Sequence, residues 1–129
     1  MTQLKGGFRM MSWEEQPYDV AAGQPKLTHA EVTHELTGGI DGEASISYLM
    51  GYRGDDRASF IGLIRVTGAI GDRAGSFVMQ DVGTFENGVA KGHWTIVPGL
   101  GTGGLQSLRG HGHFASTREK ASYLLDVEL

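Results

Sequence analysis

The sequence predicts an all-β protein, a closed antiparallel up-and-down β-barrel of about eight strands in a single domain spanning residues 1–129. Apolar and polar residues alternate with a period of two through most of the chain, as in half-buried strands. No window of about eleven residues sustains the i, i+3, i+4, i+7 apolar spacing of a helix. The 21 glycines, against 3 prolines, are spread between the apolar segments, where they indicate turns.

The composition excludes several classes of function. The net charge of -4 comes from 15 acidic and 11 basic residues mixed along the chain, so we expect no nucleic-acid partner. No run of about 18 apolar residues and no charged-then-apolar leader is present, so we expect a soluble, cytoplasmic protein that does not bind a membrane. The absence of cysteine removes disulfides, thiolate metal sites and a cysteine nucleophile.

Two strands, residues 3–12 and 26–36, are expected to begin the chain. The segment between them, from Trp13 to Gly23, combines acidic and aromatic residues with Pro17 and does not alternate. It predicts one long irregular connection.

The clearest alternation lies in residues 43–52, whose apolar face is formed by Ala44, Ile46, Tyr48, Met50 and Tyr52. The polar run 53–57, Arg-Gly-Asp-Asp-Arg, predicts a hairpin tip, and residues 58–67 predict the returning strand. This hairpin therefore presents two tyrosines on its apolar face.

Residues 73–86 alternate again and place one carboxylate on an otherwise apolar face, which consists of Phe77, Met79, Asp81, Gly83 and Phe85. Asn87-Gly88 is the strongest two-residue hairpin signal in the chain and leads into a strand over residues 89–97, ended by Pro98-Gly99. Residues 110–116 and 121–128 predict the last hairpin.

The pattern Thr-Gly-x-Ile/Leu occurs three times, beginning at Thr37, Thr67 and Thr102. Each copy predicts a strand end at which the glycine adopts a backbone angle that other residues avoid.

The predicted sheet is expected to close into a barrel. An open sheet of this size leaves two unpaired edges, and neither terminal segment carries the prolines or dense lysines that protect an edge. A closed barrel removes both edges, and it can be filled by side chains or hold one small ligand.

Two segments resemble functional motifs. His111-Gly112-His113 places two imidazoles on one face of a strand, but the sequence identifies no third ligand, so we expect polar strand residues near the barrel rim and no metal. Residues 99–104 match G-x-G-x-x-G, yet a strand and not a helix is expected to follow, so the match indicates a connecting turn. We expect no cofactor.

Polar residues on apolar faces are the better candidates for chemistry. Asp81, if it points into an apolar cavity, has a raised pKa suited to a catalytic acid or base; alternatively it pairs with a basic side chain or lies near a strand end. Tyr48 and Tyr52 could orient a ligand oxygen or simply pack in the barrel wall. The expected apolar ligand-binding wall comprises Trp13, Phe60, Ile64, Phe77, Met79 and Trp94. A register slip of one residue would turn each of these side chains to the other face.

Several motifs along nearly the whole chain resemble a bacterial domain-of-unknown-function family, namely Ser12-Trp13-Glu14-Glu15, Tyr48-Leu49-Met50-Gly51-Tyr52, the run Phe60–Gly68, and Trp94-Thr95-Ile96-Val97-Pro98-Gly99. Members of that family are similar in fold to allene oxide cyclase, a calycin-type β-barrel. The resemblance implies the same barrel, and it implies a cofactor-free reaction on a molecule held in an apolar cavity. The chain lacks the cysteine of the plant cyclase cavity, so allene oxide cyclisation itself is not expected.

We therefore expect a cofactor-free barrel that binds a small hydrophobic molecule and acts on it as an isomerase or cyclase. Two alternatives stay open, a binding protein without chemistry and a filled barrel that acts as an oligomeric interaction module. Outward apolar residues, Ile61, Leu63 and Val78, predict a homo-oligomer, most simply a dimer.

Overall fold

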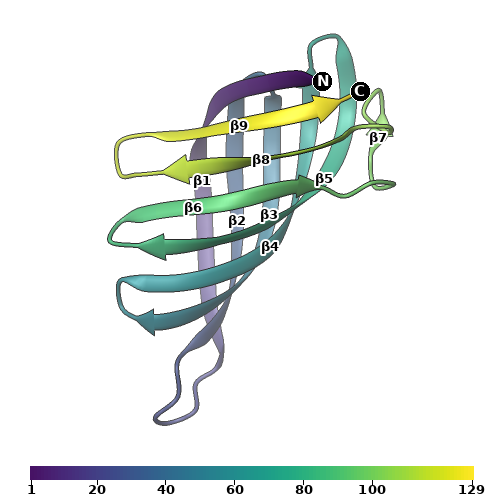
Figure 1. The fold of residues 1–129 in the computed structure, drawn as a ribbon. Helices are drawn as coiled ribbons and strands as arrows, with labels where there is room; N and C mark the ends of the chain where they lie inside the picture. Colours follow the sequence, from purple (N-terminus) through teal and green to yellow (C-terminus); the bar gives the residue numbers. More distant parts are fainter.

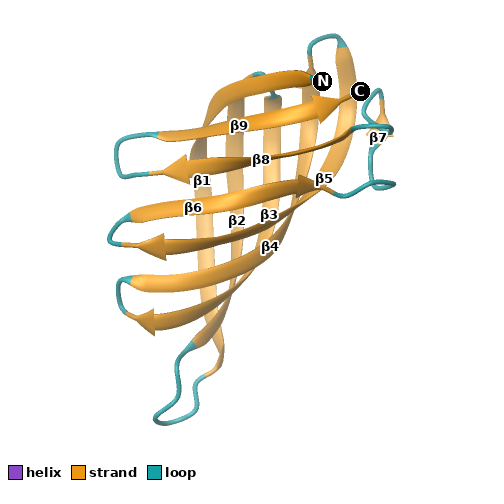
Figure 2. Cartoon of the chain, viewed as in Figure 1, coloured by secondary structure: helices purple, strands orange, loops and turns teal.

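The computed structural model describes residues 1–129 and consists of strands joined by turns (Figure 2). The strands are β1 (Thr2–Asp19), β2 (Leu27–Gly38), β3 (Asp41–Gly54), β4 (Arg57–Ile70), β5 (Arg73–Glu86), β6 (Val89–Ile96), β7 (Thr102–Gly103), β8 (Arg109–Ser116) and β9 (Ala121–Glu128). No helix is present that could cross a membrane.

Eight of the strands form a closed antiparallel barrel, as the sequence predicts. Each pairs with its neighbour in the chain, from β1 through β6 and then β8 and β9, and β9 pairs back with β1. The additional strand, β7, adds two residues to the edge of β5. This is the order of an up-and-down barrel, in which each strand pairs with the next barrel strand along the chain.

The two ends of the barrel differ. At one end β1 pairs with β9 over Thr2–Gly7, and we call this the closed half. Beyond Gly7 the strand pairs only with β2, and the β1–β2 hairpin projects past the rest of the barrel (Figure 1). Figure 1 shows β5, β6, β8 and β9 crossing in front of the later part of β1, β2 and β3. We call the open end, between Phe8–Asp19 of β1 and the turns after β3, β5 and β8, the mouth.

The irregular connection predicted from Trp13 to Gly23 is wrong for most of its length, because β1 continues to Asp19. Residues Ser12 to Pro17 pair in register with β2, after a bulge at Met11. Their side chains do not alternate between core and water because the strand extends past the body of the barrel, where both faces are largely exposed. Periodicity therefore carries no signal in this segment.

The Thr-Gly units predict two of three turns correctly. Gly38 and Gly103 have positive φ angles of 93° and 59°, but Gly68 lies inside β4 and the chain turns at Gly71, with φ 62°. A Cβ on Gly68 would lie 2.6 Å from Cα of Gly42, which faces it on β3. This glycine therefore serves close approach of two strands and not a turn.

The predicted inward faces of β3 and β5 are confirmed. Ile46, Tyr48, Phe77 and Asp81 are all buried, and they belong to or adjoin one continuous apolar core. Leu105 and Leu108, from the turn after β7, are also buried, so this connection plugs the closed half.

On the outer wall, Ile61 and Leu63 are 55% and 53% exposed, as predicted, and the homodimer that they suggest stays a prediction. The outward position predicted for Val78 is wrong, since this residue is buried. The Val97 amide donates a hydrogen bond to the Val78 carbonyl, so the start of the β6–β7 connection lies beside Val78 and shields it.

Candidate functional site

A cavity of about 660 Å³ opens at the mouth of the barrel. It lies between the later part of β1, the inner faces of β2 to β6 and β8, and the β8–β9 turn. Its walls are formed by Phe8, Arg9, Met10, Trp13, His34, Tyr48, Met50, Tyr52, Asp55, Phe60, Phe85, Ala90, Phe114, Ser116, Thr117, Arg118, Glu119, Lys120 and Ala121. The volume lies within the range of small-molecule sites, roughly 300 to 1,000 Å³.

Aromatic rings form a continuous lining. Phe114 packs edge-on against Phe8 with 5.8 Å between ring centroids, and it lies 6.3 Å from Phe60. Phe60 contacts Tyr48 at 5.1 Å, and Tyr48 lies 6.3 Å from Trp13. Rings in mutual contact hold one another in place, so the wall is apolar and pre-formed.

His34 adds a polar group to this wall. Its ring stacks on Phe8, with 4.7 Å between ring centroids, and burial lowers its pKa to about 4. The imidazole is therefore neutral at pH 7 and offers one donor and one acceptor nitrogen. Our sequence reasoning missed His34, although it shares the inward parity of Val32 and Leu36 on β2.

Tyr48 connects the cavity to a buried carboxyl group. Its ring lines the cavity, and its hydroxyl donates a 2.8 Å hydrogen bond to Oδ2 of Asp81. Tyr48 and Asp81 lie on either side of Gly62 in the sheet, and a Cβ on Gly62 would lie 2.6 Å from Cδ1 of Tyr48. The missing side chain at Gly62 therefore gives the tyrosine ring room to cross β4 and reach Asp81.

Asp81 itself is fully buried, and burial raises its pKa to about 6 against the opposing effect of the Tyr48 hydrogen bond. The Trp94 indole also opposes the rise, although neither its Nε1 nor Oδ1 of Asp81 completes a hydrogen bond. One carboxyl oxygen of Asp81 therefore has no partner. Burial and the neighbouring carboxylate also raise the pKa of Tyr48, so its phenol stays protonated.

A second polar cluster lies around Glu15 at the mouth. The Glu15 carboxylate accepts hydrogen bonds from the hydroxyl groups of Tyr52 and Thr28, the latter at 2.6 Å, and from Nε1 of Trp13 at 3.0 Å. Burial pushes the pKa of Glu15 upward, but these bonds and nearby Lys26 outweigh it, so the pKa lies below its usual value. Burial of Tyr52 and its hydrogen bond to Glu15 raise the pKa of Tyr52 to about 12. The cluster fixes the projecting β1–β2 hairpin against β3.

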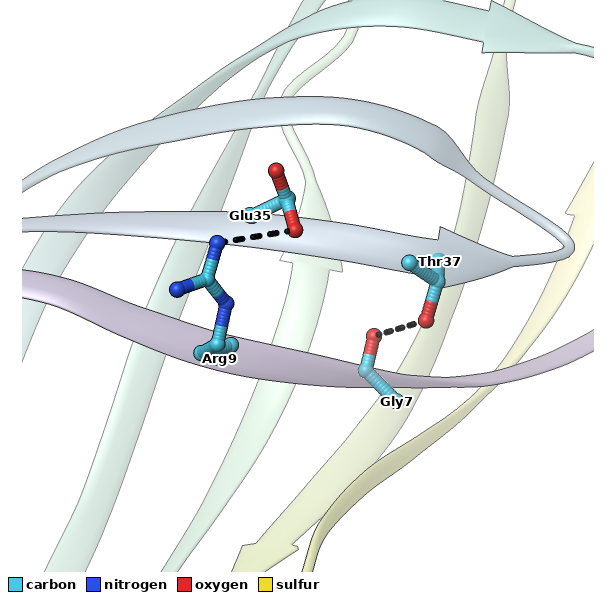
Figure 3. A network of polar contacts seen from close by, with 4 residues as sticks. All are labelled: Gly7, Arg9, Glu35 and Thr37. Carbon is cyan, nitrogen blue, oxygen red and sulfur yellow. Dashed lines mark hydrogen bonds and ion pairs between the residues drawn. The ribbon is translucent and has the colours of Figure 1, made fainter.

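Charged residues ring the opening. Arg9 Nη2 lies 3.2 Å from Glu35 Oε1 across β1 and β2, and in Figure 3 this pair lies next to the contact between Thr37 and Gly7. Of this pair only Arg9 lines the cavity, and the other charged residues that line it are Asp55, Arg118, Glu119 and Lys120. Acidic and basic groups are mixed, so the rim selects no single sign of charge.

The structure divides the candidate residues into two groups. Trp13, Tyr48, Tyr52 and Phe60 line the cavity. The remaining five do not line it and lie buried in the packed interior, namely Ile64, Phe77, Met79, Asp81 and Trp94. The hydroxyl group of Tyr48 donates a hydrogen bond to Asp81, whereas the hydroxyl group of Tyr52 donates one to Glu15.

The segments that resembled functional motifs lie elsewhere. His111 and His113 are exposed on the outer wall of β8, away from the cavity. The G-x-G-x-x-G segment, residues 99–104, connects β6 to β8 through β7, as predicted.

Comparison with known proteins identifies the family. Residues 4–127 match the family described as "Protein of unknown function (DUF3224)", and the chain belongs to this family. A DUF3224 protein of unknown function from Shewanella oneidensis MR-1, whose crystal structure has been determined at 1.84 Å, has the same fold. The two share 22% identity with a TM-score of 0.81, over 100% of this chain and 98% of the other. No curated protein matches the chain.

Proposed function

We propose that this DUF3224 barrel binds one small, largely hydrophobic molecule in the cavity at its mouth. The aromatic lining carries the proposal. Phe8, Phe60 and Phe114 surround a space of about 660 Å³, and Phe8 and Phe85 are only partly buried because no side chain fills that space. Apolar surface left in contact with water costs about 25 cal/mol per Å², so a ligand that covers it gains that free energy.

Polar groups in the cavity would orient the ligand. Neutral His34 can donate or accept one hydrogen bond on the wall, and Ser116 and Thr117 offer hydroxyl groups at the rim. The proposal favours a molecule with an apolar ring or chain and one or two oxygen or nitrogen atoms. The alternative of a filled barrel that acts only through its surface has less support, because the mouth is hollow.

Binding is tested with N-phenyl-1-naphthylamine, a neutral dye that fluoresces in apolar sites. We expect saturable binding of one dye per chain. Ala90 lines the cavity, and Ala90→Phe should fill part of it and weaken binding at least tenfold. Ala115→Phe is the matched control, because Ala115 is exposed on the outer wall of β8. Absence of saturable binding, or equal loss in both variants, would reject the proposal.

A second candidate function, cofactor-free proton transfer on the bound molecule, is favoured by the Tyr48–Asp81 hydrogen bond. Asp81 does not line the cavity, so it would act through Tyr48. The Tyr48 oxygen would accept a proton from the ligand while the hydroxyl passes its own proton to the Asp81 carboxylate. Return of that proton to another ligand atom would complete an isomerisation, the reaction class that the sequence suggests.

This relay is tested with 5-nitrobenzisoxazole, an apolar aromatic compound whose ring opens when a base removes one proton. We expect the rate to rise with pH around pH 6, where Asp81 ionises, and to fall at least tenfold in Asp81→Asn. A rate in the wild-type protein no greater than in buffer, or an unchanged rate in the variant, removes Asp81 from any such mechanism. The dye experiment decides binding independently.

A further inference from the structure

We propose that the outer wall of the barrel carries a binding site for a divalent transition-metal ion, formed by His93, His111 and His113. The sequence shows only the last two as a pair. The structure adds His93 from β6, which is the Cα partner of His113 on β8. The site lies on the outer wall and is separate from the cavity.

The sheet brings the three imidazoles together on one face. Trp94 and Gly112, the residues beside them, are buried on the inner face, so His93, His111 and His113 all point outward and are exposed. Directly opposed residues in an antiparallel pair have Cβ atoms about 4.5 to 5.5 Å apart, which is the relation of His93 to His113. The rings of His93 and His111 have centroids 5.9 Å apart.

None of the three imidazoles has a hydrogen-bond or ion-pair partner in the protein. The contrast is His29, whose Nε2 lies 2.8 Å from Glu31, and His34, which is stacked on Phe8. Three free imidazoles on adjacent strands present nitrogen lone pairs to the same region of solvent. Such donors suit Zn²⁺ or Cu²⁺ and not Mg²⁺, which prefers oxygen ligands.

A carboxylate stands beside this cluster. Asp126 on β9 is the Cα partner of His111, and its Oδ1 accepts a 3.2 Å hydrogen bond from Gln3. Its other oxygen is free to accept from a ring N–H of His111 or to bind the ion. Carboxylates that orient metal-binding histidines in this way typically contribute 10- to 100-fold in affinity.

The rings do not converge on one point in the rotamers of the structure, where no group of three ligands is placed to hold an ion. Rotation about χ1 and χ2 would bring them together. The side chains are exposed on a rigid sheet, so the rotation costs mainly side-chain entropy. The barrel backbone needs no change.

The test is calorimetric titration of metal-free protein without a histidine tag, using Zn²⁺, with Mg²⁺ as the reference ion. We expect one Zn²⁺ per chain, no heat with Mg²⁺, and at least tenfold weaker Zn²⁺ binding in each of His93→Ala, His111→Ala and His113→Ala. His29→Ala is the matched control and should bind as the wild type does. Asp126→Asn should weaken binding less than the histidine variants.

Thermal unfolding of each variant separates loss of the site from loss of the fold, because removal of an exposed side chain should leave the unfolding temperature of the metal-free protein unchanged. Absence of saturable Zn²⁺ binding to the wild type overturns the proposal. Binding that survives in all three histidine variants overturns it equally. The dye affinity of the cavity should not change when Zn²⁺ is added, so this result is independent of the function proposed above.

Discussion

The closed half and the mouth of this barrel are built from the same strands, yet one is solid and the other hollow. In the closed half, β1 pairs with β9, and Leu105 and Leu108 plug the interior. At the mouth, β1 leaves β9 after Gly7, and no connection folds in to fill the space. Regular alternation of residues therefore builds the wall of a barrel, and the loops and strand ends decide whether its interior is filled.

The two buried ionisable groups, Asp81 and His34, also lie in different regions of the barrel. Asp81 lies in the packed interior with its pKa raised, whereas His34 lies on the cavity wall with its pKa lowered. Burial causes both shifts, because it disfavours the charged form of each group. Tyr48 joins the two regions through its ring in the cavity and its hydroxyl on Asp81.

The largest expected effect comes from removing the plug. Leu105 is 1% exposed, so Leu105→Ala should lower the free energy of unfolding by about 2 to 5 kcal/mol, as other large-to-small core changes do. Met10→Ala at the mouth should change it by no more than about 0.5 kcal/mol, since Met10 is 57% exposed. Urea denaturation measures both. Similar losses in the two variants would contradict the division into a solid and a hollow half.

The pH dependence of stability should separate the two buried ionisable groups. Between about pH 4 and 6 the folded protein holds a proton on Asp81 that the unfolded chain has lost, so this residue makes the free energy of unfolding fall as pH rises. Between about pH 4 and 6.5 the unfolded chain holds a proton on His34 that the folded protein lacks, so this residue makes the free energy of unfolding rise as pH rises. Each contribution is about 3 kcal/mol at most.

The opposite effects of Asp81 and His34 on the free energy of unfolding nearly cancel in the wild type as pH changes. Variants that remove one of the two groups should reveal the effect of the other. Stability of Asp81→Asn should increase from pH 4 to 6.5, and stability of His34→Gln should decrease from pH 4 to 6. Urea denaturation at several pH values measures both. The same pH profile in all three proteins would show that neither pKa is shifted by the fold.

A smaller effect is expected where β4 makes room for Tyr48. Gly62→Ala would place a methyl group 2.6 Å from the tyrosine ring and 2.5 Å from the Ser47 carbonyl oxygen, so the free energy of unfolding should fall by about 1 to 3 kcal/mol. The displaced ring should lose its hydrogen bond to Asp81. Gly88→Ala is a useful control, since no atom lies within 4 Å of its Cβ position, and any loss there reflects only its positive φ. A Gly62 variant as stable as the wild type would contradict the role of this glycine.

Much of the wall could be predicted from the sequence. The alternation in β3 and β5 correctly placed Tyr48 and Asp81 on inner faces, and Asn87-Gly88 marked a turn whose asparagine has a φ of 52°. These predictions succeed because a strand buried on one side imposes its period on the sequence. The prediction fails for residues 13–19 of β1, where both faces are largely exposed and no regular burial imposes a period.

The cavity and its polar groups were harder to predict. The position of the cavity depends on where β1 leaves β9, which is a property of two strands at opposite ends of the chain. The meeting of Tyr48 with Asp81 depends on two hairpin registers and on the missing side chain of Gly62. His93 joins His111 and His113 for the same kind of reason, a register between strands that periodicity does not reveal.

Local periodicity and turn residues are enough to specify antiparallel strands in sequential hairpins and to set which side chains point inward. They do not specify which part of the interior is filled. Filling depends on the plug from Leu105 and Leu108 and on the point at which β1 and β9 separate, and both involve contacts between distant parts of the chain. The hollow mouth, where a ligand could bind, is therefore a consequence of closure and not of any motif.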